Sequence, residues 1–305
     1  ASQQGAPLRR RAFLFGTSEP AGLASPPSGT QADRHMRLTA LLLAAFLSTI
    51  PRAVAAEAAE PEAPANPANL FAAPAKVRPL KVALYEGPGS GAAGVTHVAN
   101  RARQLPGTTV TLLKPEEVGT RSLAEFDVII FSGGSGSGQS KAIGDIGRAK
   151  VREFVAAGGG YLGICAGAYL ACAGFDWGLG ILNARTVSNK WQRGRGMMRI
   201  QLTEPGRGLF GPVPEPFTIR YANGPIIKPL GRADLPPYEV AAVFRTEIAK
   251  NGSPVGVMID SPAVVRAPFG KGRVLTISPH SEDTPGLENF VPLALAWLGA
   301  PLGGN

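Results

Sequence analysis

The sequence predicts a three-layer α/β fold, and three observations lead to that prediction. Short apolar runs alternate with segments of helical periodicity between residues 81 and 175. Glycine-rich turns follow several of these runs, as at residues 132–136. The runs themselves contain few polar residues, which is typical of parallel strands that are buried on both faces. Repeated strand–helix units of this kind form a parallel sheet that helices cover on both sides.

The elements follow one another in a regular order up to residue 175 and change character beyond it. We expect strands at residues 81–85, 108–113 and 126–131 and directly before Cys165, with helices at residues 95–105 and 143–157. Later segments look like strands with few helices between them. They are residues 180–187, 197–202, 217–221, 238–244, 255–259, 263–267 and 273–277, before a terminal helix at residues 287–298. We therefore predict one flavodoxin-like three-layer sandwich over residues 80–300, with a mostly parallel sheet and an added antiparallel region.

The first part of the chain is expected to lie outside this domain. Residues 1–55 read as an N-terminal extension with a signal peptide at about residues 36–55. That segment has a positive start, an apolar run and an Ala-x-Ala cleavage site at its end. An uncleaved membrane anchor is the alternative, and Met36 is an alternative start. Residues 56–79 are rich in Ala, Glu, Pro and Asn and are predicted to be a disordered linker. The protein is thus expected to be exported, either periplasmic or secreted.

The charge of the chain argues against a nucleic-acid partner. The formal net charge of the 305 residues is +9, but residues 1–55 hold six arginines and only two acids. The surplus that remains on the predicted domain is too small for a nucleic-acid footprint. We expect membrane contact only through the signal peptide.

The segment around Cys165 is the strongest functional signal. Gly-Ile-Cys-Ala-Gly at residues 163–167 has the spacing of a nucleophile elbow, in which a strained turn joins a strand to a helix. Small residues two before and two after the nucleophile let the strand and the helix approach closely. The helix N-terminus favours the thiolate of Cys165. A buried structural cysteine is the plainer alternative.

The chain has two cysteines, and we expect both to be free thiols. Cys165 and Cys172 stand seven residues apart on one predicted helix, a separation of about 10.5 Å at 1.5 Å per residue. This exceeds the Cα separation that a disulfide tolerates. Free thiols in an exported protein call for a reason, and catalysis at Cys165 is one.

His280 and Glu282 are the predicted partners of the cysteine. His280 follows the last predicted strand, at the kind of strand end where α/β enzymes place catalytic groups, and Glu282 lies two residues further on. A thiol, an imidazole and a carboxylate can form a triad in which the imidazole takes the thiol proton and the carboxylate orients the ring. A loop histidine without a catalytic role is the alternative.

Five motifs together give the chain a resemblance to a known family. They are residues 85–89 after the first strand, residues 131–134, the elbow segment 161–169, residues 221–225 and residues 278–282. With these motifs the chain resembles the class I glutamine amidotransferase-like superfamily and, within it, the biotin-protein ligase N-terminal domain family. The resemblance spans about residues 81–298.

The resemblance implies a role for several residues. Cys165 would be the nucleophile, His280 the base and Glu282 its orienting partner. The backbone N–H groups of Ala166 and of Gly133 or Gly134 would form the oxyanion hole, where each donor is worth about 2.7–4 kcal/mol.

The same resemblance implies that Tyr221, Asn223 and Gly224 contribute to substrate binding. The expected function is that of an exported cysteine-dependent amidase or hydrolase acting on a small-molecule or peptide-like amide. A non-catalytic domain that binds a small molecule or peptide in the same cleft is the alternative. We expect no biotin ligation by this chain alone, because no ligase part follows residue 298.

Two further motifs and the metal question complete the sequence-based expectations. Residues 89–94 fit Gly-x-Gly-x-x-Gly, but the second predicted strand is not followed by the acidic residue that a dinucleotide site needs. Residues 190–195 are basic and contain a tryptophan. We interpret them as a solvated loop, with binding of an anionic substrate or nucleic acid as the alternative. The cysteines and histidines are too far apart for a known metal-ligand spacing, so we expect neither a metal nor another cofactor.

Overall fold

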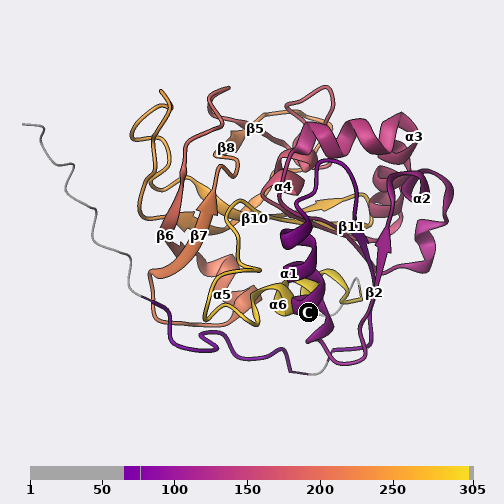
Figure 1. Cartoon of the computed structure of the whole chain (residues 1–305), viewed down its shortest axis with the longest axis horizontal. Coiled ribbons are helices and arrows are strands. Elements are labelled where there is room, and N and C mark those ends of the chain that lie inside the picture. Colours follow the sequence, from indigo (N-terminus) through magenta and orange to yellow (C-terminus); the bar gives the residue numbers. More distant parts are fainter. Residues whose placement is uncertain (1–64, 76, 302–305) are drawn as a thin grey trace, which may run out of the picture. The chain divides into compact units, whose positions relative to one another are not determined.

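The computed structural model describes residues 65–75 and 77–301, and its core is one large sheet (Figure 1). Five strands of the sheet are parallel and lie in the order β2-β1-β3-β4-β11. These strands are β1 (Lys81–Tyr85), β2 (Thr109–Leu113), β3 (Val128–Phe131), β4 (Gly160–Ile164) and β11 (Gly272–Ile277). They comprise the strands expected before Cys165 and the last strand before His280.

The sheet continues beyond β11 with antiparallel strands in the order β10-β9-β6-β7. Their bounds are β6 (Arg195–Leu202), β7 (Phe217–Ala222), β9 (Glu239–Phe244) and β10 (Pro262–Phe269). A separate two-stranded sheet pairs β5 (Ala184–Thr186) with β8 (Ile227–Pro229). The predicted fold class, an α/β sandwich with parallel and antiparallel parts, is confirmed.

Helices cover both faces of the sheet, as the strand composition requires. One face packs against α1 (Ala92–Arg103), α5 (Glu204–Phe210) and α6 (Phe290–Leu298). The other packs against α2 (Pro115–Thr120), α3 (Gly136–Ala157) and α4 (Ala166–Ala171), and a short 3₁₀ turn, η1 (Leu123–Glu125), precedes β3. Alternate residues of β1 enter the two cores: Val82 and Leu84 lie in the first, Ala83 and Tyr85 in the second. The parallel strands are therefore apolar throughout because neither face is open to water.

Two segments differ from the expectation in the second half. Residues 255–259 form turns and bends instead of a strand, with Val255 largely exposed and Gly256 at φ 78°. An apolar run without a neighbouring strand to pair with gains nothing from extended backbone. Helix α5 was not expected, because Pro205 and glycines mask its pattern. Its N-terminus is capped by Thr203, whose Oγ1 accepts a hydrogen bond from the N–H of Gly206.

The described part of the expected linker is not disordered but packs on the domain. Phe71 is fully buried, and its ring meets those of Phe217 and Phe290 at centroid distances of 5.3 and 5.2 Å. The Asn66 side chain donates to the carbonyl of Thr218 at 2.7 Å and accepts from its N–H at 2.9 Å. One buried aromatic ring and a two-way amide contact fix a segment whose composition indicated disorder.

The predicted signal peptide and extension, residues 1–55, lie outside the described residues. Within the described part of the chain, no helix combines the length and the apolar character that crossing a membrane requires.

Replacement of Phe71 by alanine tests whether the segment before β1 belongs to the core. We expect Phe71→Ala to lower the free energy of unfolding by about 3–5 kcal/mol, because it leaves a cavity among buried rings. Urea unfolding measures the change. The neighbouring exposed substitution Ala72→Ser is the control and should leave the midpoint unchanged. An equally small effect of both substitutions would mean that the segment is not held by Phe71.

Candidate active site

Cys165 lies at a sharp turn between β4 and α4. Its backbone has φ 50° and ψ −96°, a conformation that residues with a side chain rarely adopt. Its N–H donates to the carbonyl of Ile277 at 2.8 Å, so the turn is tied to the end of β11. Backbone strain of this kind persists only where the surrounding structure enforces it, and it is common at functional sites.

The two glycines of the elbow are required by close packing. A Cβ on Gly163 would lie 2.5 Å from the carbonyl oxygen of Gly167. A Cβ on Gly167 would lie 2.1 Å from the carbonyl oxygen of Phe131, on the neighbouring strand β3. Both separations are far below van der Waals contact. The spacing of small residues around Cys165 thus lets α4 start directly against the sheet, as an elbow requires.

The pairing of β4 with β11 brings His280 to Cys165. Ile164, the last residue of β4, pairs with Ile277, the last residue of β11. The two chains therefore leave the sheet at the same edge, although they are more than a hundred residues apart in sequence. The N–H of His280 donates to the carbonyl of Arg220 at 2.7 Å, which ties this loop to β7.

His280 interacts with both of its predicted partners. Its Nδ1 lies 2.7 Å from Oε1 of Glu282. Its ring also lies near enough to the Cys165 side chain for the two groups to interact electrostatically. Both His280 and Glu282 are buried, at 8% and 1% exposure. Burial on its own lowers the pKa of His280, but hydrogen bonds to Cys165 and Glu282 and their negative charges raise it to about 10. The imidazole is therefore protonated at neutral pH.

Cys172 has a different environment. Its side chain is fully buried, its Sγ donates to the carbonyl of Ala168 at 3.3 Å, and burial raises its pKa to about 12. No disulfide joins it to Cys165, as expected from the spacing. Cys172 is a core residue with little thiolate at neutral pH.

Two of the residues predicted for the oxyanion hole, Gly133 and Ala166, lie next to Cys165. A Cβ on Gly133 would lie 2.7 Å from Cε1 of His280 and 3.7 Å from Cβ of Cys165, so this glycine lies directly against both side chains. Ala166 is the first residue of α4, where helical N–H groups have no intrahelical partner. Within the described residues, the N–H groups of Gly133, Gly134 and Ala166 donate to no other group.

The close packing of Gly134 explains the glycine at position 89. It has φ 142°, and a Cβ there would lie 2.2 Å from the carbonyl oxygen of Gly89. Gly89 in turn has φ 89° and lies against the start of α3, where its Cβ would come within 2.3 Å of the N of Gln139. These glycines let two loops cross at close range, which accounts for their presence without a dinucleotide.

The three predicted substrate-binding residues are held by internal contacts. Tyr221 is fully buried, with its hydroxyl donating to the carbonyl of Gly224 at 2.7 Å. The side chain of Tyr221 thus enters the core from β7, and its contribution to substrate binding stays a prediction. Oδ1 of Asn223, at φ 57°, accepts from the N–H of Gly194 at 2.8 Å. Gly224 lies against Ser278, whose carbonyl oxygen would be 2.0 Å from a Cβ.

Several groups near Cys165 were not predicted from the sequence. The Sγ of Cys165 lies 3.5 Å from the carbonyl oxygen of Ala222, at the end of β7. Tyr169, on α4, donates to the carbonyl of Asn223 at 3.1 Å, and burial raises its pKa. Arg101, on α1, donates to the carbonyl of Glu282 at 3.2 Å. Tyr169 and Ala222 lie within the motifs at residues 161–169 and 221–225, but these motifs do not show which groups contact the site, since the contacts are tertiary.

One group of side chains has the proximity of metal ligands among the described residues. The possible ligand atoms of His280, Glu282 and Asp283 lie within 4.8 Å of one another. Nδ1 of His280 is bonded to Glu282, and Oδ2 of Asp283 pairs with Arg220 at 2.9 Å. We assign these residues to a network of hydrogen bonds and ion pairs.

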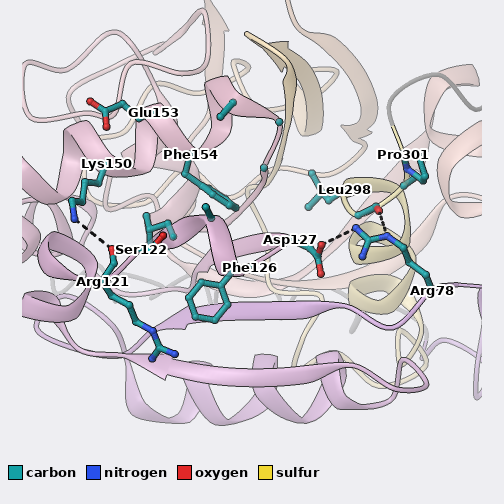
Figure 2. A pocket seen from close by; sticks show the side chains of 17 residues that line it. Arg78, Arg121, Ser122, Phe126, Asp127, Lys150, Glu153, Phe154, Leu298 and Pro301 are labelled. Carbon is teal, nitrogen blue, oxygen red and sulfur yellow. Dashed lines mark hydrogen bonds and ion pairs between the residues drawn. The ribbon is translucent and has the colours of Figure 1, made fainter.

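A cavity of about 620 Å³ lies at the opposite edge of the sheet (Figure 2). It is lined by residues that precede β3 and β4, including Asp127 and Gly159, and by the end of α6. Figure 2 shows Arg78 turned toward Asp127, with which it forms an ion pair of 2.8 Å. Because Cys165 follows the carboxyl end of β4, this cavity is remote from the elbow.

A comparison with protein families gives a match for the first half of the domain. Residues 80–190 match the family model described as Biotin-protein ligase, N terminal. The matched region runs from β1 to the segment after β5 and includes Cys165. His280 and Glu282 lie beyond it. No curated protein sequence matches the chain.

Comparison with solved structures supports the fold. PurLQS from Thermotoga maritima has a TM-score of 0.50 and 16% identity, covering 72% of this chain and 100% of that one. Cytoplasmic Protein STM3548 from Salmonella typhimurium has a TM-score of 0.45 and 15% identity, covering 71% and 98%. A β-galactosidase from Bacillus circulans sp. alkalophilus has a TM-score of 0.43 and 15% identity, covering 72% of this chain and 30% of that one. The first of these structures supports the α/β fold of the chain.

Replacement of Gly167 by alanine tests the packing of the elbow. We expect Gly167→Ala to lower the free energy of unfolding by about 1–3 kcal/mol or more, since the new methyl would overlap the backbone of β3. Thermal or urea unfolding measures this loss. Gly208→Ala is the control, because Gly208 is exposed in α5 and has open space around its Cα. It should raise stability by about 0.5–1 kcal/mol. Similar shifts at both positions would contradict the packing argument.

The raised pKa of His280 predicts a pH-dependent contribution to stability. Because the folded-state pKa of about 10 lies above the ordinary value of 6.5, this contribution is fully present below pH 6.5. It is lost as the pH rises through about 10. We expect the difference in unfolding free energy between wild type and His280→Gln to shrink over this range.

Urea unfolding at a series of pH values measures that difference. The control is His97→Gln, which removes an exposed histidine of α1 and should leave the pH dependence of the wild type unchanged. A difference that stays constant between pH 6.5 and about 10 would show that the imidazole is not held in its charged form.

Proposed function

We propose that residues 80–300 form a cysteine-dependent amidase of the class I glutamine amidotransferase-like type, and that the whole segment belongs to the biotin-protein ligase N-terminal family. The observation that carries this proposal is the contact of His280 with both Cys165 and Glu282. A thiolate beside an imidazolium is the form in which cysteine hydrolases attack carbonyl carbons.

In the proposed reaction the sulfur of Cys165 attacks the carbonyl carbon of an amide. The carbonyl oxygen becomes an oxyanion, and we assign the N–H groups of Gly133, Gly134 and Ala166 as its donors. His280 gives its proton to the leaving amine, and the thioester that remains is hydrolysed by a water molecule that His280 deprotonates. Glu282, bonded to Nδ1, keeps the ring oriented through both steps.

Three features support this proposal over a structural role for Cys165. The elbow holds the cysteine in a strained conformation, although a purely structural cysteine could occupy a relaxed turn. Among the described residues, the N–H groups of Gly133 and Ala166, two residues next to Cys165, have no hydrogen-bond partner. A buried carboxylate is bonded to the histidine, and burying a charge is costly unless it is paired.

We further propose export, with residues 36–55 as the signal peptide. This proposal rests on the positive start, apolar run and cleavage pattern of that segment.

Hydrolysis of amides by matched cysteine variants tests the proposed activity. We expect release of ammonia or amine from a panel of free amides and short peptides by the full chain. Cys165→Ala should lower kcat/KM by about 10³-fold or more, because the nucleophile is lost. Cys172→Ala is the control and should keep the activity near that of the wild type.

Two outcomes would contradict the proposal. Turnover that survives Cys165→Ala would mean that another group is the nucleophile. Absence of turnover by the wild type, together with amides that raise its melting temperature, would favour the non-catalytic binding domain that uses the same cleft.

A further inference from the structure

Two loops, which we call the loop pair, lie beside the candidate site. They are residues 188–194 before β6 and residues 247–258 after β9, and they rise above β6 and β7 in Figure 1. Hydrogen bonds of 2.8 Å join them, from the N–H of Lys250 to the carbonyl of Arg193 and from the Asn251 side chain to the carbonyl of Gln192. They therefore form one rigid feature.

The basic segment 190–195 is not simply a solvated loop, because Arg193 is only 2% exposed. Its guanidinium pairs with Glu247 at 3.0 Å and donates to the carbonyl of Ile248 at 3.1 Å. Glu247 also accepts from the N–H of Gly256 at 2.7 Å. This buried ion pair joins the two loops. The carboxylate of Glu247, the acid of the loop pair, is therefore paired inside it.

The exposed charges of this region are then all positive. Lys190, Arg195 and Lys250 are exposed, and residues 188–203 and 248–259 contain no acid. Asp283, which is half-buried in the loop after β11, already pairs with Arg220 of β7 at 2.9 Å. An anion approaching this side of Cys165 would meet uncompensated positive charge.

Of the three exposed basic residues, Arg195 is linked to the sulfur of Cys165 through the fewest intervening contacts. It is the first residue of β6 and pairs directly with Ala222 of β7. Directly opposed Cα atoms in an antiparallel pair are about 4.5–5.5 Å apart. The carbonyl of Ala222 is the one that lies 3.5 Å from Sγ of Cys165. One strand thus separates the start of the Arg195 side chain from the sulfur.

The backbone at this position is held firmly in place. Asn223 and Gly194, the next pair, exchange a backbone hydrogen bond of 3.0 Å and a side-chain bond of 2.8 Å. Within the described part of the chain, the Arg195 guanidinium has no ion pair or hydrogen bond of its own. The guanidinium therefore has hydrogen-bond donors available, and the backbone that carries it is held in place. This arrangement suits recognition of a carboxylate.

We propose that Arg195 is a specificity-determining residue, which binds a carboxylate of the substrate and directs the Cys165 site toward amides that carry a negative charge near the reacting carbonyl. This inference rests on the proposed function and adds the substrate class. Lys190 and Lys250 contribute to the attraction of anions, and Arg195 fixes their position.

Alkylation with two matched reagents tests this proposal without requiring a known substrate. Iodoacetate and iodoacetamide both transfer a two-carbon group to a thiolate with loss of iodide, but only iodoacetate carries a carboxylate. The full chain with Cys172→Ala limits the reaction to Cys165. The measured quantity is the ratio of the rate with iodoacetate to the rate with iodoacetamide.

We expect Arg195→Gln to lower this ratio by about threefold to tenfold, as an exposed charge-assisted hydrogen bond predicts. Arg195→Lys should lower it less, and added salt should reduce the effect of the substitution. Lys271→Gln is the control with the same change of charge. Lys271 is exposed before β11, about 20 Å along that strand from the edge that holds Cys165, and the ratio should not change.

The outcomes separate this inference from the proposed function. An unchanged ratio in Arg195→Gln, or no reaction of Cys165 with either reagent, overturns the role of Arg195, whatever the amidase assay gives. A ratio that depends on Arg195, with no hydrolysis by the wild type, supports anion binding at this site and contradicts only the amidase. If hydrolysis is found, Arg195→Gln should raise KM for carboxylate-bearing amides and not for neutral ones.

Discussion

The pairing of β4 with β11 is the constraint on which the candidate site depends. It aligns Ile164 with Ile277, so that Cys165 and the loop that carries His280 leave the sheet at one edge. Parallel neighbours make this meeting possible, since the carboxyl ends of both strands lie together. Insertion of β5 to β10 between the two strands does not disturb it, because most of these elements extend the sheet on the far side of β11.

Close packing then fixes the cysteine within this frame. Gly167 packs against the backbone of β3, and Gly133 packs against both the histidine ring and the cysteine. A side chain at either position would separate the groups that interact. The positive φ of Cys165 is the consequence: the chain must turn within one residue to start α4 against the sheet. Among the described residues, the same compactness leaves the N–H groups of Gly133 and Ala166 without a hydrogen-bond partner.

The parallel half of the fold could be predicted well, because strands buried on both faces are apolar without interruption. The antiparallel half was harder to predict from the sequence, because residues 255–259 are apolar but unpaired and α5 contains proline and glycine. Phe71 shows the same limit, since one ring in a polar segment carries no periodicity. Cys165, His280 and Glu282 could be selected because each lies in a short motif. The burial of Tyr221 could not be predicted, because a motif does not say on which side of a strand the side chain lies.

The sequence by itself determined the chemical groups, the elbow and the succession of strands and helices along the chain up to Cys165, because these depend on local spacing and on apolar content. Only the tertiary structure decided which groups face one another. The charge of His280 depends on burial and on two neighbours, Cys165, which is distant in the chain, and Glu282, which is two residues away. The exposure of Arg195 depends on the ion pair that Arg193 makes with Glu247. Electrostatic interactions act through space, and their strength is set by distance and by exclusion of water, neither of which is written in local sequence.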